Sequence, residues 1–136
     1  MKSQIEQKIK IITLGLLALL LLAGPVTYAA DDPSIKGDLR TNIQATMDTF
    51  IKSQTIDGTL RLYDPVEDVL LKVKLKKLHP GIVKKGDFFV SCADFVDLKG
   101  RKYDLDFLVV PAGDKLITTQ AIVHSVDGKK RKYHLE

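Results

Sequence analysis

Hydrophobic and polar residues follow three different patterns along the chain, and the first is an unbroken apolar run near the start. The run covers residues 11–23, after three lysines at Lys2, Lys8 and Lys10, and glycine and proline at residues 24–25 interrupt it. Small residues then precede two aspartates. This order of basic, apolar and small residues is typical of a secretory signal peptide. We predict a signal peptide over residues 1–30, cleaved after Ala29 or alternatively after Ala30.

The length of the apolar run distinguishes a leader from a membrane anchor. It has about 13 residues, whereas a helix needs about 20 to cross a bilayer. A cleaved leader is therefore favoured over an uncleaved anchor, and the chain is expected to be exported to a periplasmic or extracellular compartment. No cysteine follows the predicted cleavage site, so we expect no lipid attachment there.

The second pattern has the spacing of an amphipathic helix. Apolar residues recur every three or four positions, at Ile35, Leu39, Ile43, Met47 and Phe50. Such spacing places them on one helical face. Ser34 is the expected N-cap, and the helix is expected to end near Gln54.

The third pattern, an alternation of apolar and polar residues, predicts strands over the rest of the chain. Strands are expected at residues 59–64, 71–78, 88–96, 102–110, 116–126 and 131–135. The segment His79, Pro80, Gly81 is expected to end the second strand. Hairpin turns are expected at residues 97–100 and at Asp127–Gly128, where glycine can adopt a positive φ.

This order of elements, from Ser34 to Leu135, resembles that of the cystatin-like superfamily and, more loosely, the nuclear transport factor 2-like proteins. The resemblance implies a single α+β domain over residues 31–136. In that fold an N-terminal amphipathic helix packs against a curved antiparallel sheet of about four to six strands. The chain has no glycine-centred loop of the kind that blocks proteases, so the inhibitory activity of cystatins is not expected.

Charge and cysteine content narrow the function further. The formal charge is +4, and the leader contributes three lysines and one glutamate, which leaves +2 for the remainder. A nearly neutral domain without a concentrated basic face does not indicate specific nucleic-acid binding. Cys92 is the single cysteine, so no intramolecular disulfide can form, and redox chemistry and a structural zinc site both lack the ligands they would need.

The densest chemical pattern lies on the predicted central hairpin. With a turn at residues 98–100, Asp94 faces Asp104 and Cys92 faces Asp106; extending the register places His124 beside Lys102 and Gln120 beside Asp106. Clustered carboxylates and a histidine suit a cation site or acid/base chemistry. The candidate residues are Asp94, Asp104, Asp106 and His124. Alternatively, these carboxylates are solvated and paired with Lys72, Lys74 and Lys76.

Strand alternation assigns the other face of this hairpin to the core. We predict that apolar side chains of the hairpin pack on apolar side chains of the helix and form the core. The hairpin residues are Phe95, Tyr103, Leu105 and Phe107, and the helix residues are Leu39, Ile43, Met47 and Phe50.

Three further features have weaker interpretations. His79 is expected to be a turn residue, and Cys92 a reduced buried thiol or, alternatively, half of an intermolecular disulfide. A basic cluster on the last hairpin could contact anionic lipid or polysaccharide surfaces. It consists of Lys129, Lys130, Arg131 and Lys132.

Taken together, these patterns predict an exported, non-catalytic binding module without a cofactor. Its expected partner is a protein or a small ligand of the cell envelope, and membrane contact is expected only through the leader or weakly through the basic hairpin. The alternative is a cation-binding or acid/base site on the central hairpin.

Overall fold

The computed structural model describes residues 30–132 of the chain. The predicted signal peptide and its cleavage site at Ala29, as well as most of the strand expected at residues 131–135, lie outside these residues. Within them, no helix is long and apolar enough to cross a membrane.

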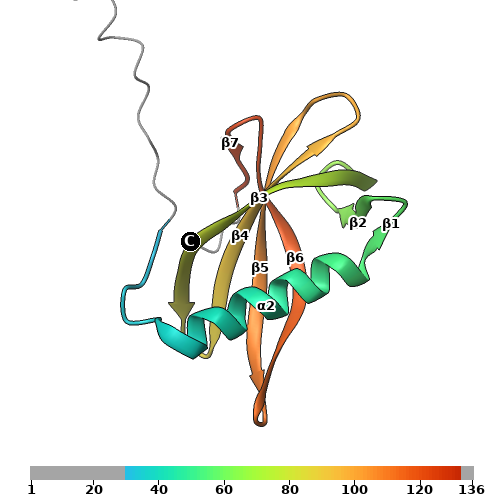
Figure 1. Cartoon of the computed structure of the whole chain (residues 1–136). Coiled ribbons are helices and arrows are strands. Elements are labelled where there is room, and N and C mark those ends of the chain that lie inside the picture. Colours follow the sequence, from blue (N-terminus) through green and yellow to red (C-terminus); the bar gives the residue numbers. More distant parts are fainter. Residues whose placement is uncertain (1–29, 133–136) are drawn as a thin grey trace, which may run out of the picture.

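One helix precedes seven strands in the described chain (Figure 1). The strands form one antiparallel sheet in which each strand pairs with its neighbours in sequence. Helix α2 lies across one face of that sheet. The elements are α2 (Gly37–Ser53), β1 (Thr55–Ile56), β2 (Thr59–Asp64), β3 (Val69–Lys85), β4 (Phe88–Asp97), β5 (Lys102–Ala112), β6 (Lys115–Val126) and β7 (Lys129–Lys130).

The expected cystatin-like α+β fold with four to six strands is wrong. The described chain is mainly antiparallel sheet, with seven strands and a single 17-residue helix placed before them. The additional strand is β1, which pairs with β2 across a turn at Asp57 and Gly58. Both turn residues have positive φ, at 50° and 72°, as a tight hairpin requires.

Strand β3 also departs from the prediction, because it does not end at the segment from His79 to Gly81. It continues to Lys85 and accommodates Pro80 through irregularities in its pairing with β4, between Leu75 and Lys77 and between Leu78 and Ile82. Proline is tolerated within a strand at such interruptions of the hydrogen-bond ladder. The long strand carries His79 into the centre of the sheet.

The segment before α2 is attached to β3 rather than capping the helix. The helix begins after Lys36, and Ser34 donates its backbone N–H to the carboxylate of Asp32 at 2.9 Å, so the expected N-cap is wrong. Asp32 donates its backbone N–H to the Ile82 carbonyl at 2.7 Å, and Asp31 accepts the Ile82 N–H at 3.0 Å. These bonds fix the chain from Asp31 onward to the sheet.

The core lies between α2 and the sheet, and the predicted face of the hairpin is confirmed. The side chains of Phe95, Tyr103, Leu105 and Phe107 are buried in one cluster with Met47. Two of the predicted helix positions differ: Leu39 is 41% exposed and lies outside the core, and Ile43 is buried in a second cluster. Ile51 takes a core position that the helical spacing had not assigned. All members of both core clusters lie between Ile35 and Val126, so the chain from Asp31 contains the complete described core.

The sheet is strongly curved. Strands β2 and β6 contact each other although they are not hydrogen-bonded neighbours. At the end of β2, the fully buried Asp64 accepts a hydrogen bond at 2.8 Å from the guanidinium of Arg131, just after β7. The sheet therefore folds over part of its own apolar face and does not depend on the helix alone for cover.

Candidate functional site

The pairing of β4 with β5 agrees with the predicted register. Asp94 lies opposite Asp104, and Cys92 lies opposite Asp106. Their neighbours in the strands, Phe95 and Tyr103, point into the core, so the four polar residues share the opposite face. The carboxylates thus gather on the side of the sheet that α2 does not cover.

His124 joins this group through a bulge that the sequence did not reveal. The expected positions of His124 beside Lys102 and Gln120 beside Asp106 are wrong, because the register of β5 and β6 shifts between Asp104 and Leu105. Ser125 faces Asp104, while Gln120 faces Leu108. A bulge re-aims a side chain, and here it brings His124 Nδ1 to 2.9 Å from Asp106 Oδ2.

Asp106 connects the histidine to the thiol. Its other oxygen, Oδ1, accepts a hydrogen bond from Cys92 Sγ at 3.1 Å. The side chains of Asp106 and His124 are 0% and 3% exposed. Buried polar groups are costly unless hydrogen-bonded, and these contacts hold the thiol in a fixed position on the sheet.

His79 approaches the same thiol from β3. Its Nε2 lies 3.1 Å from Asp94 Oδ2, and its side chain is only 16% exposed. Its second nitrogen, Nδ1, is buried and has no hydrogen-bond partner among the described residues. The imidazole is therefore oriented by Asp94 through one nitrogen, while the other remains available for a ligand.

The carboxyl group of Asp104 lies in a desolvating environment. Its Oδ1 is buried without a hydrogen-bond partner in the described part of the chain. Desolvation raises the pKa of Asp104 from 3.8 to about 6, assisted by the charges of Asp106 and Asp94 and opposed by His79 and His124. Such a carboxyl is partly protonated in mildly acidic solution and gains from a nearby cation.

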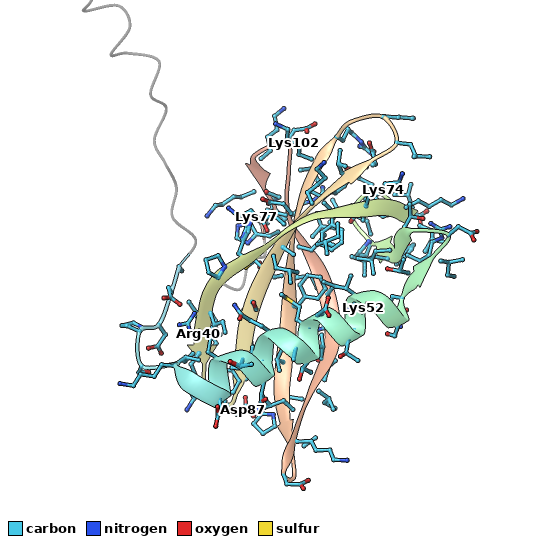
Figure 2. All side chains as sticks on the ribbon, in the orientation of Figure 1. Arg40, Lys52, Lys74, Lys77, Asp87 and Lys102 are labelled. Carbon is cyan, nitrogen blue, oxygen red and sulfur yellow. The ribbon has the colours of Figure 1, made fainter. Side chains whose placement is uncertain are left out.

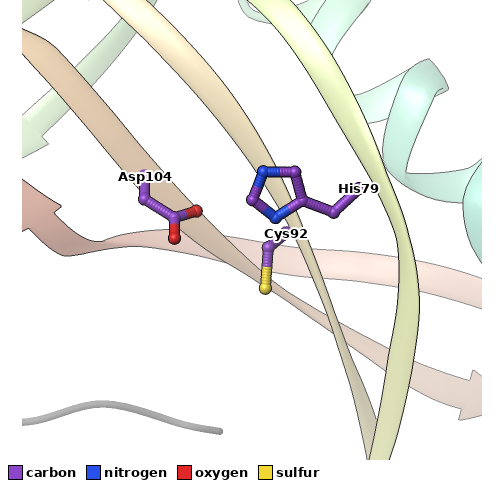
Figure 3. A group of neighbouring side chains, drawn as sticks. All are labelled: His79, Cys92 and Asp104. Carbon is purple, nitrogen blue, oxygen red and sulfur yellow. The ribbon is translucent and has the colours of Figure 1, made fainter. Parts of the chain in front are cut away.

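These side chains converge on one point of the sheet. One ligating atom each of His79, Cys92 and Asp104 lies within 4.8 Å of the others. Figure 3 shows the imidazole above the thiol, with the Asp104 carboxylate turned toward them. Imidazole nitrogen, thiolate sulfur and carboxylate oxygen are the donor types that transition-metal ions take in proteins.

A pocket of about 440 Å³ adjoins this point. Asp94 and Asp104 line it together with Lys76, Lys102 and Ser125. Asp104 thus belongs both to the group of converging side chains and to the pocket wall.

The alternative interpretation, in which lysines of the preceding strand pair with these carboxylates, does not agree with the contacts of the described residues. Lys77, rather than Lys72, Lys74 or Lys76, lies opposite Asp94 in the register. Within the described residues, the ion-pair partner of Asp94 is His79. The sheet face is thus organised around histidine, thiol and carboxylate.

The predicted basic cluster on the last hairpin is divided by the fold. Lys129, Lys130 and Lys132 are exposed. Arg131 is instead bound to the buried Asp64 at 2.8 Å and to Glu67 at 3.1 Å. Its guanidinium therefore joins the residue after β7 to the end of β2 and to the β2–β3 turn.

Sequence reasoning placed Asp94, Asp104, Asp106 and His124 in the candidate site but set aside His79 and Cys92. The missed signal was the register of β3: Lys77 faces Asp94 and Leu78 faces Ala93, so one further residue brings His79 next to Cys92. That step required β3 to continue through Pro80.

No protein-family model, curated protein or solved structure matches this chain, so its chemistry rests on the side chains described above.

Proposed function

We propose that this protein is a metal-binding module that takes a divalent transition-metal ion, with Zn²⁺ the best match, through His79, Cys92 and Asp104. The observation that carries the proposal is the convergence of their three donor atoms within 4.8 Å. Donors around a tetrahedral zinc ion lie about 3.3–3.8 Å apart, given the usual zinc–ligand distances. Small side-chain rotations would close the present arrangement onto an ion.

The hydrogen bonds around the donors support this choice of ligands. Histidines that bind a metal usually donate their other ring N–H to a carboxylate. His79 has this arrangement, because Asp94 faces its Nε2 and leaves the buried Nδ1 for the metal. Without metal, Asp106 orients Cys92 by accepting a hydrogen bond from its thiol, and that thiol proton is the one that would be released when the thiolate binds the ion.

The donor chemistry selects the class of metal. A thiolate and an imidazole suit zinc and related transition metals, whereas calcium and magnesium prefer all-oxygen sites. Cys92 and Asp104 would together supply two negative charges, which balance a divalent cation. The ion would also relieve the repulsion among Asp94, Asp104 and Asp106.

Three protein ligands leave a fourth position for water or a small ligand. Open positions of this kind distinguish exchangeable or reactive zinc sites from closed structural ones. The adjoining pocket would give access to that position. If the predicted leader exports the chain, the module would handle metal in the cell envelope.

The direct test is a titration of untagged residues 31–136 with Zn²⁺ and Co²⁺, followed by calorimetry and absorption spectroscopy. We expect one ion per chain, a thiolate-to-Co²⁺ charge-transfer band, and release of protons on binding. His79→Gln, Cys92→Ser and Asp104→Asn should each weaken binding by about tenfold or more, because each removes one ligand.

The matched control is Asp87→Asn, which removes an exposed carboxylate at the β3–β4 turn, away from the donor set. Its affinity should equal that of the unaltered chain. Absence of the charge-transfer band, or equal weakening by the control substitution, would show that the ion does not bind at the proposed ligands.

A further inference from the structure

A second surface combines exposed apolar residues with lysines that form no ion pair with another described residue. It lies at the tips of two hairpins, the β2–β3 turn and the β4–β5 turn. Four bulky apolar side chains there are more than half exposed: Tyr63 at 56%, Val66 at 53%, Leu70 at 58% and Leu98 at 79%. We call these four residues the tip patch.

The two turns form one surface. Glu67 in the first turn pairs with Arg101 beside the second at 3.1 Å. A shallow groove of about 230 Å³ runs between them, and Leu70 and Leu98 both line it. Tyr63 lies directly opposite Leu70 in the register of β2 and β3. Monomeric proteins seldom leave such contiguous apolar side chains in water without an interaction to serve.

Lysines surround the tip patch and have no anionic partner. Lys72, Lys74, Lys99 and Lys102 are exposed and form no ion pair with another described residue. Lys72 follows Leu70 on the same face of β3, with Arg61 directly opposite it. Like charges in such positions destabilise a sheet, so an anionic partner would relieve the repulsion.

Lysines on β3 and β5 lie on either side of β4. Lys74 faces Val96 on β4, and Val96 in turn faces Lys102 on β5. Figure 2 shows Lys74 and Lys102 at the end of the molecule opposite Asp87. The acidic groups near the tips are already occupied: Glu67 binds two arginines, Asp97 binds Arg101, and Asp68 accepts a hydrogen bond from Tyr63.

We propose that the tip patch and its lysines dock onto an anionic phospholipid surface, with Leu70 and Leu98 entering the boundary between headgroups and acyl chains. Lipid phosphates match the unpaired lysines, and the acyl region matches the apolar tips. A nucleic acid or an acidic polysaccharide would use the lysines alone and leave the apolar side chains in water. The long lysine side chains can reach the headgroups while the tips lie deeper.

Tryptophan fluorescence gives a positive test, because the chain contains no tryptophan. Leu98→Trp in residues 31–136 should shift its emission to the blue and become protected from iodide on addition of vesicles of phosphatidylcholine with about 30 mol% phosphatidylglycerol. Ile117→Trp, at an exposed site on β6, should show neither effect. An unchanged spectrum for Leu98→Trp, or equal changes for both variants, would overturn the proposal.

Vesicle cosedimentation separates the two contributions. The affinity should be about tenfold or more higher for the anionic vesicles than for vesicles of pure phosphatidylcholine. The affinity for anionic vesicles should also fall by about tenfold or more when the salt concentration is raised from about 50 mM to about 500 mM. Leu98→Ser and the pair Lys72→Gln with Lys74→Gln should each reduce binding severalfold, whereas Lys115→Gln should not. Binding to heparin or DNA as tight as to vesicles, and unaffected by Leu98→Ser, would refute the lipid assignment.

Discussion

Two aspartates on the same hairpin show how the surroundings of a residue decide its chemistry. Burial opposes ionisation of Asp97, but Arg101 and backbone N–H groups of Lys99 and Arg101 donate to its carboxylate, and its pKa is lowered. Asp104 is desolvated without such donors, and its pKa rises to about 6. The sequence shows two similar aspartates, whereas only the hydrogen-bond partners in the folded chain distinguish the one with a lowered pKa from the one with a raised pKa.

Asp104 should make the stability of the metal-free domain depend on pH. Its pKa rises from 3.8 to about 6, so the folded state holds the proton more tightly than the unfolded chain. This stabilising contribution is fully present below about pH 4 and is lost as the pH rises to about 6. Asp104→Asn, which resembles the protonated acid, should remove the decline and be at least as stable as the unaltered chain at pH 7.

Urea unfolding between pH 4 and pH 7 in the presence of a chelator measures this effect. Asp114→Asn, in the exposed β5–β6 turn, should keep the slope of the unaltered chain. A lower stability of Asp104→Asn at pH 7 would mean that the ionised carboxylate has a stabilising partner.

At the scale of elements, the packing of α2 on the sheet depends on aromatic contacts that strand alternation predicted. Phe107 is fully buried, with its ring centroid 6.1 Å from Phe50 on the helix in an edge-on arrangement and 6.2 Å from Phe95 on β4. The period of the helix was less informative at its start, where Leu39 remains exposed. The spacing of apolar residues identifies which face of the helix packs on the sheet. How many residues of that face are buried depends on where the sheet ends.

Truncation of Phe107 should therefore be far more costly than truncation of Leu39. Phe107→Ala removes a fully buried ring and leaves a cavity, so the free energy of unfolding should fall by about 3–5 kcal/mol. Leu39→Ala should change it by less than about 1 kcal/mol, because the side chain is largely solvated. Denaturant unfolding compares the two directly, and similar losses would indicate that Leu39 belongs to the core.

At the scale of the molecule, a buried ion pair joins the end of β2 to the residue that follows β7. Asp64 at the end of β2 is fully buried, and Arg131 after β7 neutralises it at 2.8 Å while also binding Glu67. Glu67 extends the network to Arg101 on the β4–β5 hairpin. These residues are distant in sequence, and only the curvature of the sheet brings them together.

Loss of Arg131 should destabilise the closed sheet more than loss of any neighbouring lysine. Arg131→Ala leaves the carboxylate of Asp64 buried without its counter-ion, which should cost about 2–4 kcal/mol. Lys129→Ala, at an exposed position of β7, should stay within about 0.5 kcal/mol of the unaltered chain. Thermal unfolding of both variants tests this, and equal stability would show that the ion pair does not hold the strands together.

The sequence by itself determined the helix, the main strands and the faces of the central hairpin. These features follow from local periods and from turn residues such as Gly100 and Gly128, whose φ values of 83° and 77° suit tight turns. The pairing of Asp94 with Asp104 and of Cys92 with Asp106 followed from the turn length alone. Each depends on residues close in the chain, so composition and spacing are sufficient to predict them.

Only the tertiary structure decided which residues complete the candidate site. His79 lies in the candidate site because β3 continues through Pro80 with an irregularity in its pairing. His124 lies there because a bulge shifts the register of β6 against β5. Bulges depend on the fit between whole strands and on the curvature of the sheet, and neither leaves a local pattern in the sequence. The geometry of the candidate site is therefore a property of the folded sheet, assembled from residues whose sequence context suggested a turn and an ordinary strand.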